Sequence, residues 1–461
     1  MSNNGLKRLN IVNHSLFFLC RVVLALTFIF SGFVKAIDPI GTQYKIQDYA
    51  EAAGYGSFLN DTVTLSASVL LATMEFAMGM FLLFAIYRRF VSRLMVLFML
   101  VMTVVTVWIY VADPVSDCGC FGDAIVLSNG ETLLKNIILL AMSLVVAWKP
   151  LNMVRFVSLS NQWIVFHYTF VFILGLSVWC LYDLPIFDFR PYHLGANIQQ
   201  DMEIPEGAEQ PKFETYFILE KDGVRKEFTL DEYPDSTWTF IDSRTEQITK
   251  GYVPPIHDFS MTSLDDSEDF TEEILSHPGY TFLLISPHLE NADDSTFGNI
   301  DIIYEYASDN GYPFYCLTAS GDSAIAHWRD ITGAEYQFLH TDDVTLKTII
   351  RSNPGLLLLK DGTVIGKWSH NFLPVDDFLA APLEKSEMGK LHDDGNTKRV
   401  VMILLWFVLP LVLLTIADRL WFWSRWLKQK EEKIIQVSQA QYESEDRSRD
   451  EIEDKSKDKL S

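Results

Sequence analysis

The sequence predicts a multispan α-helical membrane protein with a separate α/β domain outside the bilayer. Five long apolar runs crowd the first 182 residues, and a sixth occupies residues 400–417. Most of these runs approach or exceed the ~18–20 residues that a helix needs to cross a bilayer. Between the fifth and sixth runs, short strand-like patterns alternate with helical ones and with Gly-containing turns, which is typical of an α/β domain.

The fourth run is the shortest, and the first could be mistaken for a signal peptide. The length of the first run, and Lys35 near its outer end, favour a retained helix. The six predicted spans cover residues 15–37, 63–87, 94–112, 133–148, 163–181 and 400–417.

The orientation follows from Lys and Arg residues, which are enriched in cytoplasmic loops. These residues gather before the first run, between the second and third, between the fourth and fifth, and after the sixth. If all six runs span, every cluster falls on one side, whereas omitting the fourth span would separate them. We therefore expect a bacterial inner-membrane protein with both termini in the cytoplasm and with residues 38–62, 113–132 and 183–397 in the periplasm.

The periplasmic part of this topology carries most of the negative charge of the chain. The acidic excess behind the net charge of −23 lies in the periplasmic part, which argues against nucleic acid or an anionic lipid surface as a partner. The predicted partners are the lipid bilayer and a periplasmic protein.

The topology divides the chain into five parts. They are a four-helix membrane module (1–158), a fifth helix (159–182), the periplasmic domain (183–397), which is thioredoxin-like over about 255–385, a sixth helix (398–418) and a charged cytoplasmic tail (419–461). In this tail a helix is expected to fray into disorder from about residue 431.

The periplasmic part opens with an irregular segment, residues 183–212, and continues with alternating elements. A hairpin is expected over residues 215–230, with Asp222-Gly223 as its turn dipeptide. The other predicted strands lie at 280–286 and 313–319 and in a hairpin over 353–370, and the predicted helices at 298–311, 323–333 and 343–352.

Over about residues 255–385 this order resembles the thioredoxin and peroxiredoxin-like fold. The matching stretches are "PPIHDFSMTSLDDSEDFTEEI", Pro354 where that family keeps a cis proline, and the hairpin "LLLLKDGTVIGKW". The family's active cysteines follow the first central strand, but here that place reads "SPHLENAD" (286–293) and holds no cysteine. The resemblance therefore implies a redox-inactive binding domain, in which Cys316 is a buried inert thiol and His288 has no nucleophile beside it.

The membrane module carries four features that together resemble the DoxX-like membrane proteins, and among them the MauE (methylamine utilisation) branch. They are the Gly32-x-x-Lys35 end of the first helix, Glu75 in the second, "CGCFG" (118–122) after the third, and Asn136 in the fourth. The resemblance covers residues 15–150. It implies a membrane protein tied to the maturation of a disulfide-rich partner, with quinone-linked electron transfer in related members.

Glu75 lies near mid-membrane, where an ionisable group is costly and is usually functional or paired. Counting ~1.5 Å per residue along each run, neither Lys35 nor Arg21 lies level with Glu75, so direct pairing would need a tilted helix or the full reach of a long side chain. We therefore expect a protonated Glu75 that bonds to a hydroxyl such as that of Ser31 or Thr27. Its role is either a proton or quinone contact or a structural bond between helices.

Cys118 and Cys120 are separated by one glycine, which lets the chain bend enough to bring them within disulfide distance. A bond between them would close a very small loop and would constrain the unfolded chain little. This favours a catalytic redox pair over a structural disulfide. A Cu(I) site and a pair without chemical role are the rival interpretations, and Cys180 is a candidate resolving thiol.

Two functions remain open from the sequence. In the first, the protein is a thiol–disulfide conduit that exchanges with a periplasmic partner and passes electrons to quinone. In the second, it is a non-enzymatic assembly protein whose outer domain binds a client. The missing cysteines of the outer domain favour the second function, whereas the Cys118–Cys120 pair and Glu75 favour the first.

Overall fold

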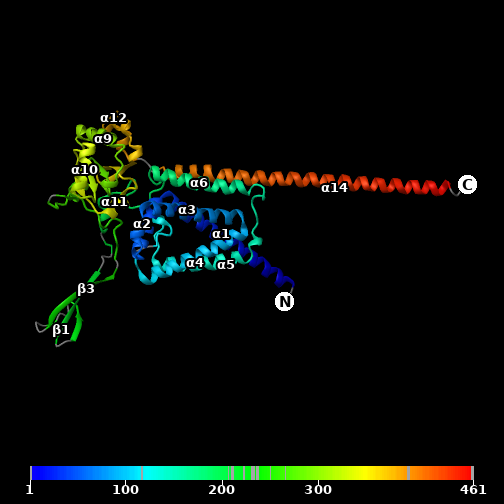
Figure 1. Ribbon diagram of the computed structural model, residues 1–461, viewed down its shortest axis with the longest axis horizontal. Coiled ribbons are helices and arrows are strands. Elements are labelled where there is room, and N and C mark those ends of the chain that lie inside the picture. Colours follow the sequence, from blue (N-terminus) through cyan, green and yellow to red (C-terminus); the bar gives the residue numbers. More distant parts are fainter. Residues whose placement is uncertain are drawn as a thin grey trace.

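The computed structural model describes residues 3–115, 118–205, 207–208, 212–221, 224–229, 234, 238–249, 251–264, 266–391 and 395–457. Within these residues, six helices are long and apolar enough to cross a membrane, as the hydropathy predicts. Their candidate spans are His14–Ile37, Asp61–Phe84, Arg88–Ala112, Asn129–Trp148, Gln162–Tyr182 and Asn396–Ala440. Figure 1 shows both chain ends on the side of the helices that faces away from the α/β domain.

The fourth span is longer than its apolar run because polar residues cap it. The fourth span starts at Asn129 since Ser128 and Glu131 form a reciprocal capping box. It therefore reaches 20 residues, enough to cross a bilayer. The helices are α1 (Asn3–Ile37), α2 (Pro39–Ala52), α3 (Asp61–Phe84), α4 (Arg88–Ala112), α5 (Asn129–Trp148), α6 (Gln162–Tyr182), α13 (Asn396–Ile403) and α14 (Leu409–Lys457).

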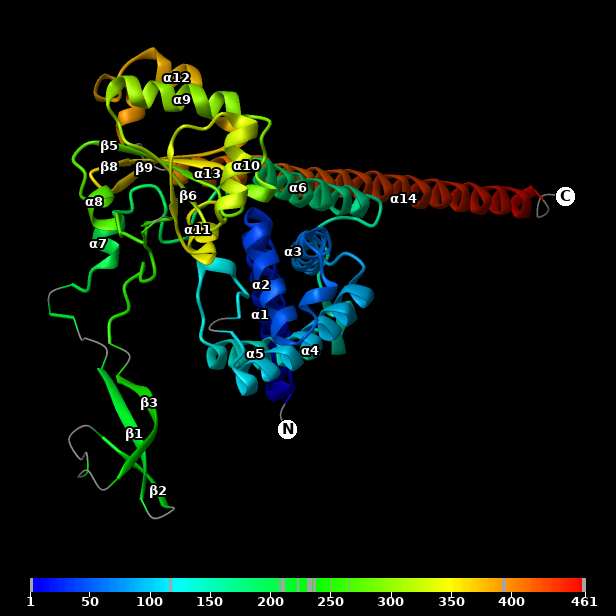
Figure 2. The same ribbon diagram turned by 60° about the vertical axis from the view of Figure 1, so that its left-hand side comes forward.

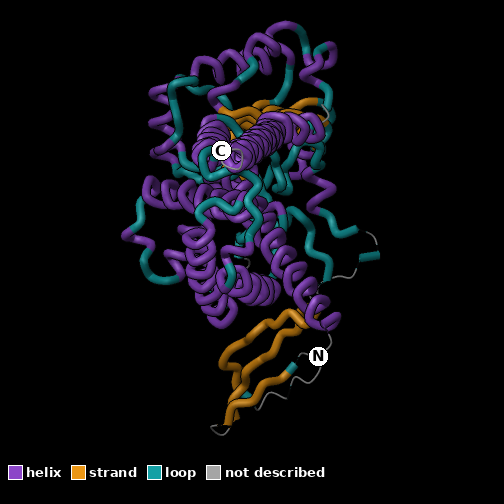
Figure 3. Tube along the Cα trace, turned by 90° about the vertical axis from the view of Figure 1, so that its right-hand side faces the viewer, coloured by secondary structure: helices purple, strands orange, loops and turns teal. Residues whose placement is uncertain are grey.

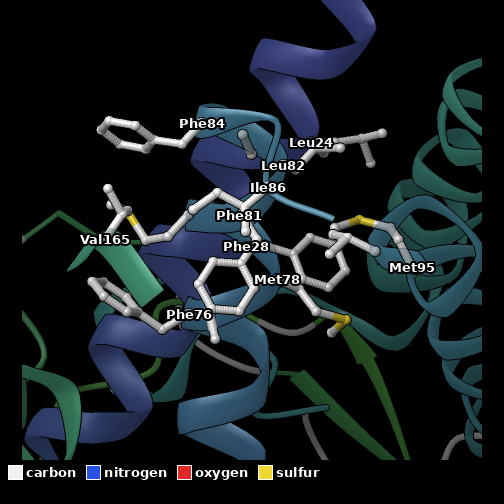
Figure 4. Close-up of a cluster of buried hydrophobic side chains, with 14 of the residues drawn as sticks. Leu24, Phe28, Phe76, Met78, Phe81, Leu82, Phe84, Ile86, Met95 and Val165 are labelled. Atoms are coloured by element: carbon white, nitrogen blue, oxygen red, sulfur yellow. The ribbon is translucent and has the colours of Figure 1, made fainter. Parts of the chain in front are cut away.

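Helices α1 and α3 approach each other closely at two glycines. A Cβ atom on Gly32 of α1 would lie 2.3 Å from the Phe76 nitrogen of α3, and one on Gly79 would lie 2.7 Å from the Ile29 nitrogen. Small residues at such crossings let helix backbones pack tightly in membranes. Buried side chains including Leu24, Phe28 and Phe76 fill the space around this crossing (Figure 4).

We expect Gly32→Ala to destabilise the bundle strongly. The new methyl group meets backbone atoms of α3, which cannot rotate away, so the two helices must separate and lose packing worth about 1–3 kcal/mol or more. The midpoint of thermal unfolding in detergent measures the loss. Gly175→Ala in α6 is the matched control, because nothing lies within 4 Å of its added Cβ. Equal midpoints for the two variants would contradict the close crossing.

The α/β domain is built on a six-stranded sheet with the order β4-β7-β6-β5-β8-β9. Strands β5, β6 and β7 are parallel, while β8 runs antiparallel to β5 and forms a hairpin with β9. The Asn353–Pro354 peptide bond before β8 is cis. The strands are β4 (Thr262–Ser263), β5 (Tyr280–Ile285), β6 (Phe314–Thr318), β7 (Gln337–His340), β8 (Gly355–Lys360) and β9 (Thr363–Ser369).

Every residue of β5 is buried because helices cover both faces of this sheet (Figure 2). One core contains Phe282 with residues of α9 and α10, and the other contains Leu283 with residues of α8 and α11. The helices of the domain are α7 (Ile198–Met202), α8 (Thr271–Leu275), α9 (Phe297–Asn310), α10 (Asp322–Thr332), α11 (Asp343–Ile349) and α12 (Val375–Ala380). The elements predicted at 280–286, 298–311, 313–319, 323–333, 343–352 and 353–370 all form.

A second, three-stranded antiparallel sheet stands apart from the first (Figure 3). Its order is β2-β1-β3, with β1 (Lys212–Lys221), β2 (Val224–Phe228) and β3 (Thr239–Thr249). The predicted pairing of β1 with β2 is confirmed, and the turn dipeptide Asp222-Gly223 lies outside the described residues. The sequence reading missed β3, whose mixture of polar and apolar residues carries no strong strand period.

Two further elements differ from the expectations. Residues 39–52 form α2, because Asp38 caps its N-terminus by accepting a bond from the Gly41 amide and Pro39 occupies the first turn. The C-terminal tail does not fray at 431 but continues as helix to Lys457.

Candidate functional site

The two vicinal cysteines lie at the mouth of the helical bundle, in the loop between α4 and α5. Gly119 and Gly122 both adopt positive φ, +59° and +53°, which lets the chain fold back on itself. As a result the Sγ atoms of Cys118 and Cys120 lie 2.7 Å apart. Both cysteines are free thiols in the structure, and their sulfurs are less than 1 Å further apart than the ~2.05 Å of a disulfide bond. The pair needs little movement to oxidise.

A buried polar cluster lies directly below this loop. The Lys35 ammonium donates to Glu75 Oε2 at 2.9 Å, to Ser31 Oγ at 2.7 Å and to the Cys120 carbonyl at 2.5 Å. All three of its donors are therefore used. Ser31 Oγ lies 2.7 Å from Glu75 Oε2 and 2.8 Å from the Cys120 carbonyl. The sequence singled out the thiols and Glu75 separately, and the structure joins them through one lysine.

The count along each run favoured a hydroxyl over Lys35 as the partner of Glu75, but both Ser31 and Lys35 bond to it. The depth of each side chain depends on how the two helices are aligned, and the ends of the apolar runs do not give that alignment. The glycine contacts at the α1–α3 crossing do. Gly32 faces Ala72 and Phe76, so Ser31 is level with Glu75 and Lys35 is one turn above it. The long lysine side chain bridges that turn. Ser31 contacts Glu75 as expected, whereas Thr27 does not bond to it among the described residues.

The other two predicted polar residues of the membrane part have separate surroundings. Arg21 donates to the carbonyls of Leu82 and Leu83 at 3.0 and 2.5 Å, so it closes the C-terminus of α3 and makes no contact with Glu75. Asn136 of α5 donates to Thr106 Oγ1 of α4 at 3.3 Å and links these two helices.

The environment makes the two thiols chemically unequal. The pKa of Cys120 is lowered to about 6, chiefly by the hydrogen bond from the Cys118 thiol and then by the charges of Lys135 and Lys35, which together outweigh the opposing effect of burial. The same bond and burial raise the pKa of Cys118 above its ordinary value. Cys120 is therefore the thiolate near neutral pH.

Lys135 is a functional candidate that sequence reasoning missed. Its Nζ atom lies 4.3 Å from the centroid of the Phe121 ring, next to Cys120, and so brings a positive charge to the loop. The only signal for it in the sequence is its position beside Asn136, nearly two turns into a predominantly apolar helix. A further anchor, Tyr49 of α2, donates its hydroxyl to the Cys118 carbonyl at 2.6 Å.

A small cavity of about 40 Å³ lies on the membrane side of the loop. Its volume accommodates one or a few water molecules. Polar groups from α1, α3, α5 and the thiol loop meet apolar side chains of α1 and α4 around it. Its lining includes Ser31, Lys35, Glu75, Cys120, Lys135 and Asn136 on the polar side and Phe28, Phe98, Met99 and Met102 on the apolar side.

A much larger cleft, of about 570 Å³, lies on the other side of the loop. Gly119, Gly122 and Asp123 of the loop form part of its wall, together with residues of α2, of α11 and of the segment 185–191. This volume lies within the ~300–1,000 Å³ that is usual for ligand sites. The loop with the two thiols therefore separates the outer cleft from a cavity within the bundle.

Arg351, which follows α11, fastens the α/β domain to this mouth. It is buried, and its guanidinium donates to both carboxylate oxygens of Asp38 at 3.0–3.1 Å and lies 3.6 Å from Asp123. Burial alone would raise the pKa of Asp38, but the charges of Arg351 and Arg190 outweigh it and hold that pKa below its ordinary value. The pair therefore stays ionised at neutral pH and joins the domain to the thiol loop.

The remaining sequence candidates do not join this site. Cys180 is buried in α6 and makes no sulfur contact with the pair among the described residues. Cys316 is fully buried in β6, and burial raises the pKa of its thiol, so it is inert as expected. His288 pairs with Asp343 at 3.0 Å. No group of three or more potential metal ligands occurs in the described part of the chain.

Fold and site together define a multispan membrane protein whose bundle carries a thiol pair above a buried ion pair. Residues 13–149, which contain both pairs, match the family described as methylamine utilisation protein MauE. The membrane part is thus MauE-like, as its motifs indicate. Residues 213–250, which hold the three-stranded sheet, match a domain of unknown function (DUF8463). No curated protein and no solved structure matches the chain.

Proposed function

We propose that this protein exchanges a disulfide between Cys118 and Cys120 and a cysteine pair of an extracytoplasmic partner. The observation that carries the proposal is the contact between the two sulfurs at 2.7 Å, on a loop whose carbonyls are held by Tyr49 and Lys35. A fixed loop keeps the pair together in both oxidation states. In this proposal the loop faces the periplasm, the membrane is the bacterial inner membrane, and the Lys and Arg clusters lie in the cytoplasm.

The exchange runs in two balanced steps. A partner thiolate attacks Cys118 of the oxidised pair, and Cys120 leaves because the thiol with the lower pKa is the better leaving group. The second partner thiolate then attacks the partner sulfur of this mixed disulfide and releases Cys118. One disulfide forms in the partner while one breaks here, so two electrons and two protons pass to Cys118 and Cys120. The reverse sequence reduces a partner disulfide.

A quinone, which the resemblance implies as electron acceptor, does not fit the cavity beside Cys120. The cavity volume of about 40 Å³ is far below the ~300 Å³ at the lower end of ligand sites. The proposed chemistry is therefore the exchange with the outer partner alone. Within it, Glu75 and Lys35 hold the Cys120 carbonyl and contribute charge near the thiolate.

The α/β domain would position the partner over the outer cleft. The parallel order of β5, β6 and β7 and the antiparallel β8–β9 hairpin support a thioredoxin-like domain. The segment after β5 holds no cysteine, so this domain would bind rather than react. The docking of Arg351 on Asp38 and Asp123 supports a role in which the domain covers the thiol loop.

The test is the oxidation state of the pair in intact cells. Thiols are trapped with acid, and a maleimide mass tag then counts the free ones, before and after a pulse of reductant. We expect Cys118 and Cys120 to move together between a tagged and an untagged form. A Cys120→Ser variant should accumulate a mixed disulfide in the reverse sequence, because Cys118 attacks a partner disulfide and the thiol that would resolve the product is missing. A pair that never changes state, in a correctly folded protein, would refute the exchange.

The second candidate function is an assembly protein without redox chemistry, in an accessory role of the kind that the name of the matching family suggests. Its support is the outer domain, which lies outside the MauE match, lacks the reactive cysteines and is fastened over the mouth of the bundle. In that case Cys118→Ser/Cys120→Ser would keep full function in the cell, whereas Arg351→Met would lose it.

A further inference from the structure

Arginine side chains gather at the end of the bundle that faces away from the α/β domain (Figure 1), where α4 begins. Arg88, the first residue of α4, donates to two carbonyls of the segment 149–161 at 2.8 and 2.9 Å, which holds the two parts of the chain together. Arg155 and Arg89 are close enough to Arg88 for their positive charges to act on it. Arg88, Arg89 and Arg155 therefore form one basic cluster.

No carboxylate is built into the segments that form the basic cluster. Residues 85–93 and 149–161 contain neither Asp nor Glu. The carboxylate that α14 brings to this end, that of Asp418, accepts bonds from Ser158 and Asn161 instead. Like charges that are held together repel one another and destabilise the compact state. The arrangement therefore favours an anion that comes from outside the chain.

Arg155 carries an open donor of the basic cluster. Its Nε atom is buried, and it has no hydrogen-bond partner in the described part of the chain. Buried donors are nearly always bonded, so an unpaired one points to a missing acceptor. Helix α4 adds to the positive field, because its N-cap residue Tyr87 makes no side-chain cap and the first amides of the helix stay open. Phosphate oxygens are acceptors that suit both guanidinium groups and a helix N-terminus.

Exposed aromatic side chains place the basic cluster at the depth of lipid headgroups. Tyr87, Trp148 and Trp163 lie at this end of the spans, and 60% to 83% of each side chain's residue is exposed. Such residues are enriched where the membrane meets water. Farther along α4, Phe90 and Leu97 are also exposed, so apolar surface that suits acyl chains adjoins the cluster. A lipid phosphate can therefore reach the arginines while its chains stay in the bilayer.

We propose that the basic cluster binds the phosphate of an anionic phospholipid. Arg155 donates to the phosphate through the guanidinium that the chain leaves open, and the charges of Arg88 and Arg89 reinforce the bond. The lipid carries a net negative charge, because a zwitterionic headgroup would bring a further cation to a cluster of cations. The bound phosphate relieves the repulsion and so stabilises the start of α4 against the segment 149–161. This site is independent of the thiol chemistry at the other end of the bundle.

The test compares two arginine variants of the full-length protein in a non-ionic detergent. Arg155→Gln removes one charge of the basic cluster, whereas Arg93→Gln removes the same charge at an exposed position of α4 that does not act on Arg88. Native mass spectrometry measures the binding of phosphatidylglycerol, with phosphatidylcholine as the zwitterionic reference. We expect Arg155→Gln to weaken phosphatidylglycerol binding at least about fivefold, which corresponds to the ~1 kcal/mol of one basic residue near an anionic lipid.

The matched variant and the reference lipid decide the outcome. Arg93→Gln should bind phosphatidylglycerol as the native protein does, and both should prefer it to phosphatidylcholine. Equal losses in the two variants would assign the binding to the general surface charge, and equal binding of the two lipids would show that no anion site exists. Either result would overturn the proposal.

Thermal unfolding separates a ligand site from a structural role of Arg155. Without lipid, Arg155→Gln should unfold no earlier than the native protein, because it removes a repulsion and breaks no bond of the described chain. Phosphatidylglycerol should then raise the midpoint of the native protein more than that of the variant. A variant that unfolds earlier without lipid and gains as much from it would make Arg155 structural. Inorganic phosphate is the third probe, and a shift equal to that of the lipid would assign the site to a soluble anion.

Discussion

Lys35→Met will lower the free energy of unfolding by about 3–5 kcal/mol, which is typical when one partner of a buried ion pair is removed. Both side chains of the pair are almost inaccessible, at 6% and 5%. Without the ammonium, Ser31 is the one hydrogen-bond donor left to Glu75 among the residues that the structure describes. The Cys120 carbonyl also loses a bond. Chemical unfolding in detergent measures the loss, and faster alkylation of the buried Cys118 reports the loosened loop.

Two variants separate the charge effect from a simple change in packing. Lys35→Met/Glu75→Gln removes both charges, so its cost should be well below the sum of the two single costs. Lys149→Met, at an exposed site, should change stability by no more than about 0.5 kcal/mol. Additive costs in the double variant would show that the two side chains do not interact.

Cys118→Ala will move the pH midpoint for alkylation of Cys120 upward by about two units, toward the ~8.5 of an ordinary thiol. Alkylation requires the thiolate, so its rate rises as the pH passes the pKa. In the native protein that pKa is about 6, mainly because the Cys118 thiol donates to the Cys120 sulfur. Mass spectrometry of the peptide that contains Cys120 measures the rate between pH 5 and 10 in reduced protein.

Lysine variants show which other charges contribute to this thiolate. Lys135→Met should raise the midpoint by less than Cys118→Ala, since Lys135 is a smaller cause, and Lys135→Arg should restore it. Lys45→Met is the control: Lys45 packs against Gly119 on the cleft side and is not among the causes of the shift. A midpoint that stays near 6 in Cys118→Ala would show that the two thiols are not coupled.

Much of the fold follows from local patterns in the sequence. The spans are predictable because a chain in lipid must bond its backbone internally, so long apolar helices are the available solution. The strands of the larger sheet are equally visible, because burial on both faces makes β5 and β8 continuous apolar runs. The segment α2 was missed because its mixed composition carries no apolar period, and a cap and a proline define it instead.

For the site, the sequence by itself singled out most of the candidate residues. Cys118, Cys120, Glu75, Lys35, Arg21 and Asn136 were recognisable because thiols and charges are rare and costly in such a chain. Which of them act together was decided only by the tertiary structure. The crossing of α1 and α3 at Gly32 and Gly79 sets a register that no count along one helix reveals, and that register places Lys35 between Glu75 and the carbonyl of Cys120.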